Sequence, residues 1–254
     1  MRGAWAIVGA LFVVFLLAPI VLLVLFAFTS RTLTNFPLEG LSLRWWGEMV
    51  RLRGFGDALR KQELRVRAAA GASGVVGTLA AIGLSLLPRR QAGAAMAVLT
   101  LPVMLPPLVL GVALLSFYVT AGVPLGLPTV ILSHVLFAQP FVILVVHARM
   151  TSFDWRLVES ARDLGASPPR AFATVLLPVI APVVVGAGLL ALALSVDDFV
   201  ITFFTIGTGN TLPTLVWGMI RTGLTPAVNA IGTTILLVTI GSTILALWLT
   251  RYRG

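Results

Sequence analysis

Long apolar stretches separated by short polar segments dominate this sequence. The first, Trp5 to Thr29, is too long for the core of a signal peptide and long enough to cross a bilayer as a tilted helix. With 58% hydrophobic residues, 11% charged residues and a mean hydropathy of +1.03, the 254-residue chain has more apolar surface than a water-soluble domain could cover. The sequence therefore predicts an integral membrane protein.

Six apolar stretches predict an all-helical, multi-pass protein that forms one transmembrane domain over residues 1–254. The expected spans are about 5–29, 66–87, 94–118, 127–147, 179–204 and 227–249. The third contains Pro102, Pro106 and Pro107, which must kink or break a helix because proline lacks an N–H donor. A helix broken in this way can line a translocation path, and a simple packing kink is an equal alternative. His134, in the fourth span, is expected to hydrogen-bond to a neighbouring helix rather than to titrate.

The residue types that are missing or rare exclude several functions. The chain has no cysteine, so disulfides, thiolate metal sites and a cysteine nucleophile are excluded. Its net charge of +9 would suggest nucleic acid in a soluble protein, but these charges lie beside apolar spans, where they orient helices. We therefore expect no nucleic acid partner. The only lysine, Lys61, precedes glutamine, so no Gly-Lys-Ser/Thr phosphate loop exists here, and any ATP must be hydrolysed by a partner.

The long polar passage from Asp154 to Pro178 is expected to form two short helices joined at a glycine. Asp154 can cap the first helix, and Gly165 can end it in the left-handed conformation. Its apolar side chains recur at helical spacing at Leu157, Ala161 and Leu164. Ser167 can cap the second helix, with Pro168 at its first position. A helix of about ten residues is marginal alone in water, so the passage must dock on something.

The residues of this passage follow a recognisable pattern. Glu159-Ser160-Ala161 is followed after three residues by Gly165, and after nine more by Val175-Leu176-Leu177-Pro178. This resembles the EAA loop of ATP-binding-cassette (ABC) importer permeases, with serine for the first alanine and valine for isoleucine. In that family the loop is cytoplasmic and its helix sits in a cleft of the ATPase subunit. The resemblance implies a coupling loop at about 148–178, with this role for Glu159, Ser160, Ala161, Asp163, Gly165 and Pro178. The alternative is a solvated connector between two membrane helices.

The distribution of Lys and Arg predicts the orientation only in part. With the amino terminus inside, nine basic residues lie in inner segments and nine in outer ones, so the positive-inside rule does not decide. Eight of the outer nine belong to the first loop, which ends in the charged run Arg60 to Arg67. Without that loop the count is nine to one. We expect the amino terminus inside, because a docking loop must face a cytoplasmic ATPase, and the basic first loop has no explanation in the sequence.

Two adjacent carboxylates, Asp197 and Asp198, lie near the end of the expected fifth span. On a continuous helix Ser195, Asp198 and Thr202 would share one face, with Asp197 one step around. A carboxylate deep in a bilayer costs about 2.5 to 3.5 kcal/mol, so acids there usually face a water-filled cavity or a partner. A cationic substrate would be such a partner, which makes these four residues candidates for the substrate path. The alternatives are that Asp197 caps a helix break or that Asp198 pairs with Arg221.

The C-terminal part of the chain also resembles the spermidine/putrescine group of permeases. The matches are Asp197-Asp198-Phe199, Thr211-Leu212-Pro213, Arg221-x-Gly223-x-Thr225-Pro226 and Asn229-Ala230. This resemblance implies a polyamine as the substrate, with another small solute as the alternative.

The two resemblances together imply a type I importer permease of MetI-like fold in a bacterial inner membrane. Such a subunit forms the path for a solute delivered by an extracytoplasmic solute-binding protein. It works beside a second permease subunit and with two ATPase subunits, which use ATP and Mg²⁺. We expect no catalytic residue, metal site or cofactor in this chain. The alternatives are an ATP-independent channel or carrier and, less favoured, a membrane-embedded enzyme, for which no HExxH or GxSxG motif occurs.

Overall fold

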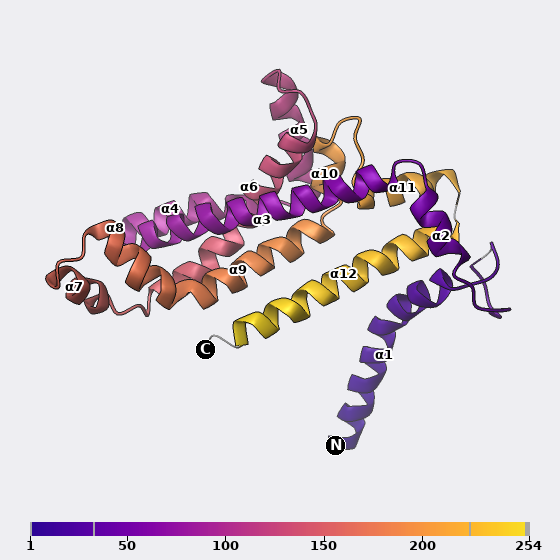
Figure 1. Ribbon diagram of the computed structural model, residues 1–254, viewed down its shortest axis with the longest axis horizontal. Coiled ribbons are helices and arrows are strands. Elements are labelled where there is room, and N and C mark those ends of the chain that lie inside the picture. The colour runs from indigo at the N-terminus through magenta and orange to yellow at the C-terminus, as the bar shows by residue number, and fades with distance from the viewer. Residues whose placement is uncertain (1, 33, 224, 252–254) are drawn as a thin grey trace. The chain divides into compact units, whose positions relative to one another are not determined.

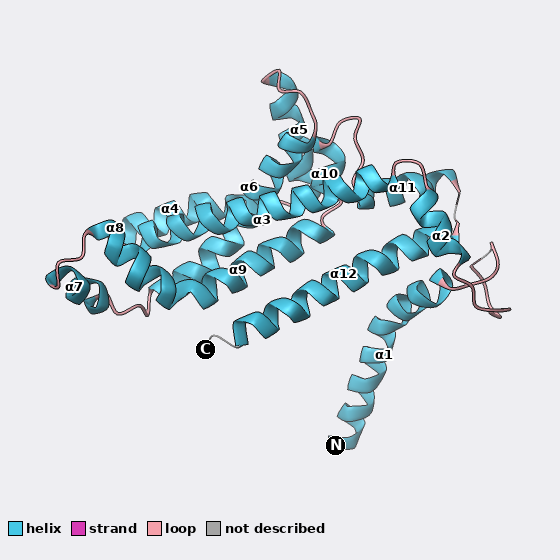
Figure 2. Ribbon diagram, in the orientation of Figure 1, coloured by secondary structure: helices cyan, strands magenta, loops and turns pink. Residues whose placement is uncertain are grey.

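The structure, a computed structural model, describes the backbone of residues 2–32, 34–223 and 225–251. Side chains are described for residues 5–32, 34–196, 198–223, 225–241 and 244. Throughout these residues the regular secondary structure is helical (Figure 2), and the only strand-like pairing in them is an isolated bridge between Thr29 and Leu41. The prediction of an all-helical chain is confirmed.

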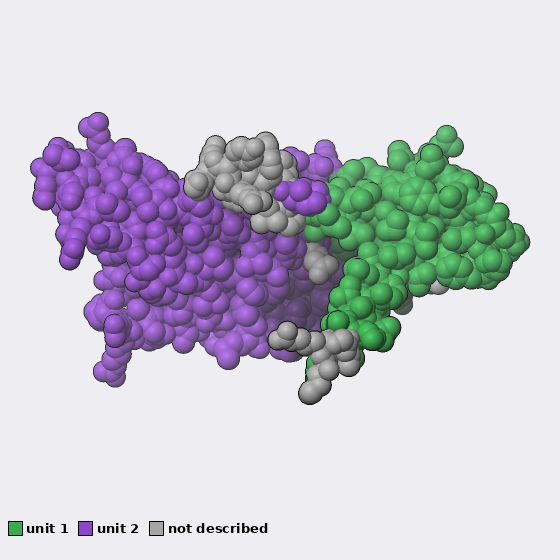
Figure 3. Space-filling model, turned by 90° about the horizontal axis from the view of Figure 1, so that it is seen from below, with its two compact units in different colours: residues 1–59, 210–240 green, residues 60–209, 241–254 purple. Residues whose placement is uncertain are grey.

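The chain divides into two compact units, Met1–Leu59 with Asn210–Ile240 and Arg60–Gly209 with Gly241–Gly254 (Figure 3). Unit 1 contains α1 (Arg2–Ala27), α2 (Arg44–Arg51), α11 (Leu212–Thr222) and parts of α3 (Phe55–Ser85) and α12 (Pro226–Arg251) (Figure 1). Its core consists of Ala27, Trp45, Met49, Phe55, Ala58, Leu212, Ala227, Ala230 and Ile231.

Helix α2 lies against the core of unit 1 because its sequence is amphipathic. Trp45 and Met49 are one turn apart and buried, and Trp45 Nε1 donates a hydrogen bond to the Thr29 carbonyl at 2.7 Å. Basic residues of this region are paired with acids, in the ion pairs Arg44–Glu48 and Arg31–Glu39. Part of the positive charge of the first loop is therefore neutralised locally.

Unit 2 is built around α6 (Leu127–Met150), which packs along α9 (Leu177–Asp197) and also contacts α4 (Arg89–Met104) and α10 (Val200–Thr205). Its other elements are the rest of α3, α5 (Pro107–Thr120), α7 (Arg156–Asp163), α8 (Pro168–Ala171) and a π-helical turn (Phe172–Leu176). Helices α3 and α6 approach closely at Gly77, where a Cβ would lie 2.8 Å from the Val142 side chain. Only glycine fits this crossing without displacing α6.

The second span begins earlier than the sequence predicts. It was expected from residue 66, but α3 starts at Phe55, so the charged run Arg60 to Arg67 is helical. Arg67 pairs with Glu63 across one turn at 3.5 Å, which supports the helix locally. The expectation that this charged run belongs to the first loop is therefore wrong.

The fifth span also begins earlier than residue 179. One continuous helix runs from Pro168 to Val196, so Pro178 lies inside it and not at the end of a loop. In an α-helix the Pro178 ring would clash with the carbonyl of Thr174. The π-helical turn just before it, in which the Leu177 N–H donates to the Phe172 carbonyl, widens the helix at that point and accommodates the ring.

The third span is broken, as its prolines predict. Helix α4 ends at Met104, α5 begins at Pro107, and the two are bent by 100°. Leu105 is extended, with φ −87° and ψ 134°, because a following proline excludes the helical conformation.

The fifth span is also broken, although the sequence predicts that it continues to residue 204. Helix α9 ends at Asp197 and α10 begins at Val200, with no proline or glycine between them.

Four helical stretches in the described part of the chain are long and apolar enough to cross a membrane, and the bent pair α4 and α5 makes a fifth. The four lie in α1, in α3, in α6 and in the continuous helix Pro168–Val196. The sixth expected span corresponds to α12, whose segment Pro226–Gly241 is apolar. The described part of the chain thus supports four or five of the six predicted spans, and an apolar helical segment lies where the sixth is expected.

We expect Gly77→Ala to lower the stability of the protein by about 1 to 3 kcal/mol, because the added methyl group overpacks the contact with Val142. The measurement is the thermal unfolding midpoint of the purified protein in detergent. Gly74→Ala is the matched control, since a Cβ at Gly74 on the same helix meets nothing within 4 Å. Equal midpoints for the two variants would show that α3 and α6 do not pack as described.

Candidate functional site

Helix α7 forms the first half of the expected docking passage. Asp154 Oδ1 accepts a hydrogen bond from the Arg156 N–H at 3.1 Å, close to the start of the helix. Gly165 follows its end with φ +90°, the left-handed conformation that favours glycine. Gly165 therefore ends α7 as the sequence predicts, whereas Asp154 lies one residue before the N-cap residue Trp155 and bonds only to the first N–H of the helix.

The structure shows which face of α7 turns toward the protein. Trp155 and Val158 pack against the core of unit 2, and Trp155 makes an edge contact with Phe153 at 5.1 Å between ring centroids. Leu157 is 47% exposed and Leu164 is 90% exposed. The two leucines therefore present an apolar surface outward. Exposed apolar surface rimmed by charges is typical of a protein-binding site.

The second half of the passage continues directly into α9. Ser167 is extended ahead of α8, with φ −66° and ψ 156°, but its side chain makes no capping hydrogen bond, so that part of the prediction is wrong. Pro168 occupies the first position of α8, as expected. The passage is thus one short helix, a glycine turn, and the beginning of a membrane-spanning helix.

The turn between α7 and α8 is hollowed. A surface hollow of about 540 Å³ is lined by Glu159, Arg162, Asp163, Gly165, Ala166, Ser167 and Pro168. Three of the predicted coupling residues, Glu159, Asp163 and Gly165, therefore meet at one place. Ser160 and Ala161 lie on the same helix, whereas Pro178 lies on α9 beyond the π-helical turn.

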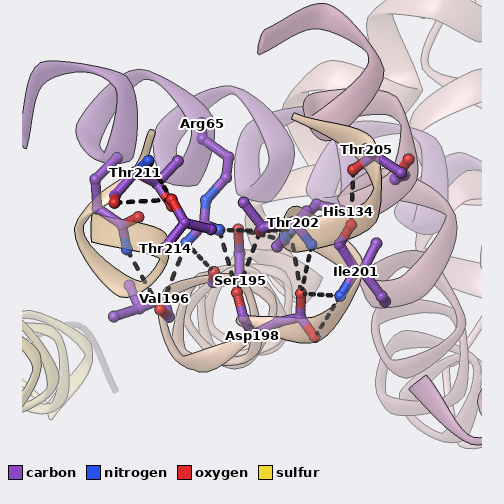
Figure 4. Close-up of polar contacts among 12 residues, drawn as sticks. Arg65, His134, Ser195, Val196, Asp198, Ile201, Thr202, Thr205, Thr211 and Thr214 are labelled. Carbon is purple, nitrogen blue, oxygen red and sulfur yellow. Dashed lines mark hydrogen bonds and ion pairs between the residues drawn. The ribbon is translucent and has the colours of Figure 1, made fainter. Parts of the chain in front are cut away.

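A second site lies at the other end of α9, where the fifth span breaks (Figure 1). The last carbonyl groups of a helix lack N–H partners within it. At the end of α9 the Arg65 side chain of α3 provides the missing donors (Figure 4). Its Nη2 donates to the carbonyls of Ser195 at 2.7 Å and Val196 at 3.4 Å. Its Nη1 donates to the Asp198 carbonyl at 3.2 Å. Gln62, one turn earlier on α3, donates to the Val196 carbonyl at 3.3 Å.

The start of α10 is satisfied by an acid. The Asp198 carboxylate accepts hydrogen bonds from the N–H groups of Ile201 at 3.1 Å and Thr202 at 3.3 Å. A carboxylate at this position is favoured by the helix dipole as well as by the bonds. The Asp198 side chain is only 7% exposed. The sequence offered Asp197 as the acid that caps a helix break, and that side chain lies outside the described residues; the acid that binds the start of α10 is Asp198.

His134 of α6 also belongs to this cluster and contacts residues of both α9 and α10. Its Nε2 lies 2.8 Å from Thr202 Oγ1 and 3.4 Å from Asp198 Oδ2, and its Nδ1 lies 3.1 Å from Ser195 Oγ. A proton on Nε2 suits this arrangement, because Nε2 faces two oxygens while Nδ1 can accept from the serine hydroxyl. The expected hydrogen bond from His134 to a neighbouring helix is present. Arg65 Nη1 also donates to Thr202 Oγ1.

The structure brings together three of the four predicted path residues, Ser195, Asp198 and Thr202. The side chain of Asp197 lies outside the described residues. Sequence reasoning missed Arg65, which is fully buried. The signal was present in the charged run: at helical spacing Arg65 shares a face with Ala58, Gln62 and Ala69, all buried, whereas Glu63 and Arg67 are exposed.

Among the described residues, no three His, Asp or Glu side chains gather in a way that could hold a metal ion. The two sites are a surface hollow outside the apolar spans and a polar cluster within them, joined by one helix. Polar side chains buried within apolar spans are typical of a membrane transport protein.

A family model described as binding-protein-dependent transport system inner membrane component matches residues 73–253. The chain belongs to this family and is a permease subunit of a type I ABC importer.

Two relatives match almost the whole chain. The putrescine transport system permease protein PotI of Escherichia coli (strain K12) is 36% identical over 244 residues, which covers 92% of this chain and 86% of the relative. The spermidine/putrescine transport system permease protein PotC of Haemophilus influenzae is 31% identical over 238 residues, which covers 93% of this chain and 92% of the relative.

Solved structures share the fold. A permease chain of a bacterial ABC transporter that imports the acidic polysaccharide alginate aligns with a TM-score of 0.76 at 15% identity, over 99% of this chain and 96% of that one. A chain of the MetNI methionine ABC transporter aligns with a TM-score of 0.65 at 18% identity, over 84% of this chain and all of that one. The predicted type I importer permease fold is confirmed.

Proposed function

We propose that this chain is a permease subunit of a polyamine importer and that it forms the path for putrescine or spermidine with a second permease subunit. The observation that carries this proposal is the 36% identity with a putrescine permease along 92% of the chain. The solute reaches the path from an extracytoplasmic binding protein, and two ATPase subunits, which use ATP and Mg²⁺, supply the energy. Catalysis of ATP hydrolysis lies outside this chain.

The ATPase binds at the docking passage. Two features support this assignment. One is the exposed apolar surface at Leu157 and Leu164, which a partner could cover. The other is the hollow lined by Glu159, Asp163 and Gly165, which a partner side chain could fill. Ser160 and Ala161 belong to the same binding helix. Pro178 was expected to contact the ATPase with these residues. It lies instead within α9, the helix that follows the docking passage, and so contributes to the shape of that helix.

Movement at the docking passage reaches the membrane through α8, the π-helical turn and α9, which form one continuous helix. Closure of the ATPases would displace α7 and with it the start of this helix. A rigid helix with two discrete arrangements is how a distant hydrolysis step can bias two membrane states. Alternating access to the substrate path follows from that bias.

The substrate path runs past the break between α9 and α10, at Ser195, Asp197, Asp198 and Thr202. Acids within an apolar span support a path for a cation. On a continuous helix Asp198 would have faced the substrate more directly than Asp197. The break removes the basis for that ranking, because Asp198 already accepts N–H bonds from α10.

The membrane is the bacterial inner membrane, and the amino terminus lies on its cytoplasmic side. The supports are the family's inner-membrane location, the distribution of Lys and Arg outside the first loop, and the burial or local pairing of several basic residues in that loop.

We expect Leu164→Asp and Glu159→Lys each to reduce co-purification of the ATPase subunit with the permease at least tenfold, because both changes alter the outward face of α7 without touching the core. The measurement is the amount of ATPase recovered per permease from detergent-solubilised membranes. Thr151→Ala, an exposed change outside α7, is the control and should have no effect. Normal recovery with both α7 variants would rule out this face as the docking surface.

We expect membranes that contain the whole transporter to accumulate labelled putrescine in an ATP-dependent manner, and unlabelled spermidine to compete. Gly165→Pro should abolish this uptake while the permease remains in the membrane, because proline cannot adopt φ +90°. Uptake is measured in inside-out or reconstituted vesicles with the binding protein supplied. Transport of a different solute, without competition by either polyamine, would refute the substrate assignment.

We expect a cysteine at Ser167 to react with a membrane-impermeant maleimide only from the cytoplasmic side, and a cysteine at Ala121 only from the outside. Both positions are exposed, and the native chain has no cysteine to give a background. The readout is labelling of intact cells compared with inverted vesicles. The opposite pattern would reverse the proposed orientation.

A further inference from the structure

Arg65 is a buried cation inside a membrane-spanning helix, and the coupling mechanism does not use it. Its side chain is fully buried, although charged residues in such segments are costly unless they are paired or functional. Arg67, two residues later on the same helix, is 76% exposed and pairs with Glu63. The burial of Arg65 is therefore specific to its position.

The Arg65 guanidinium stabilises the break in the fifth span by hydrogen-bonding to the free carbonyl groups at the end of α9. It donates to three backbone carbonyls between Ser195 and Asp198 and to Thr202 at the start of α10. No proline or glycine lies at this break, so side chains must stabilise it. A planar guanidinium with several donors can bridge two helix ends in this way, whereas the compact ammonium group of lysine cannot. Its Nε has no hydrogen-bond partner among the described residues, so all the bonding is through the two terminal nitrogens.

The same group also balances the charge of the break. Asp198 holds the N–H groups of α10 on one side, and Arg65 holds the carbonyl groups of α9 on the other. The pair contributes one negative and one positive charge, so the charge of Asp198 is offset before any substrate arrives. A cationic substrate that passes this break meets a less negative site than the two adjacent acids alone would make.

We propose that Arg65 is a positioning and specificity-determining residue of the substrate path. It fixes the geometry of the break between α9 and α10, and by offsetting Asp198 it limits how strongly the path favours the more highly charged of two cations. This inference rests on the proposed function, in which a polyamine passes the break.

The experiment uses the complete transporter in proteoliposomes, with saturating putrescine or spermidine as the probes. The variants are Arg65→Met, Arg65→Lys, Asp198→Asn and the double variant Arg65→Met/Asp198→Asn, with Arg67→Met as the exposed control. The quantity compared is the ratio of the maximal uptake rates of spermidine and putrescine. Damage to folding or assembly scales both rates together, so this ratio reports charge and not the amount of intact complex.

Arg65→Met leaves Asp198 unopposed and should raise the ratio about threefold or more, because spermidine carries one more positive charge than putrescine. Asp198→Asn leaves Arg65 unopposed and should lower the ratio by a similar factor. The double variant restores the balance and should return the ratio to within about twofold of the wild type. Arg65→Lys keeps the charge and should also stay within about twofold. Single variants without opposite effects, or a double variant without recovery, would overturn the specificity role.

The positioning role is measured without any substrate, by amide hydrogen exchange over residues 199–206 in the assembled complex. Exchange there should be at least tenfold faster in both Arg65→Met and Arg65→Lys and unchanged in Arg67→Met, while the α7 segment stays as in the wild type. Unchanged exchange in the two Arg65 variants would overturn the positioning role. A wild-type transporter that accumulates neither polyamine would refute the proposed substrate and the specificity role together, and exchange alone would then decide the positioning role. If Arg65→Met fails to assemble, recovery of the ratio in the double variant relative to Asp198→Asn tests the specificity role, and exchange in Arg65→Lys tests the positioning role.

Discussion

A peptide group in the hydrocarbon core of a bilayer must find its hydrogen bond within the protein, and this requirement determines where a membrane helix can break. The chain meets it in two ways. Between α4 and α5 the prolines themselves remove an N–H donor and exclude the helical conformation at Leu105. Between α9 and α10 the free groups are bound by side chains from other helices, chiefly by the Arg65 guanidinium on α3. These bonds join α3 to the end of α9 and to the start of α10.

Sequence reasoning predicted what local residue types determine. The length of the apolar stretches predicted membrane spans, and the prolines predicted the break in the third span. Gly165 predicted the left-handed turn of the docking passage. It failed where the outcome depends on contacts with distant residues. The break at Asp198 has only one local signal, the adjacent acids, because the other groups that stabilise it come from residues 62, 65 and 134. The early start of α3 was missed for the same reason, since a charged run looks like a loop until its buried face is known.

The docking helix shows a different kind of limit. Its helical periodicity predicted an apolar face correctly as a pattern, but periodicity does not say which way a face points. Trp155 and Val158 offered a second apolar face, and the larger aromatic contact with Phe153 decided the orientation of α7. The two leucines stay exposed. An apolar face on a short helix of a multi-subunit protein can therefore equally mark an external contact.

The continuous helix from Pro168 to Val196 is long enough to act as a lever between its two ends. At 1.5 Å per residue its 29 residues span about 43 Å, so a tilt of about 5° at the docking end would displace the far end by about 4 Å. That displacement exceeds the length of any hydrogen bond that Arg65 makes to α9 and α10. The π-helical turn sits close to the docking end, so any bending there would shorten the rigid arm only slightly. A tilt of this size at one end of the helix would therefore be large enough to change the contacts that its other end makes.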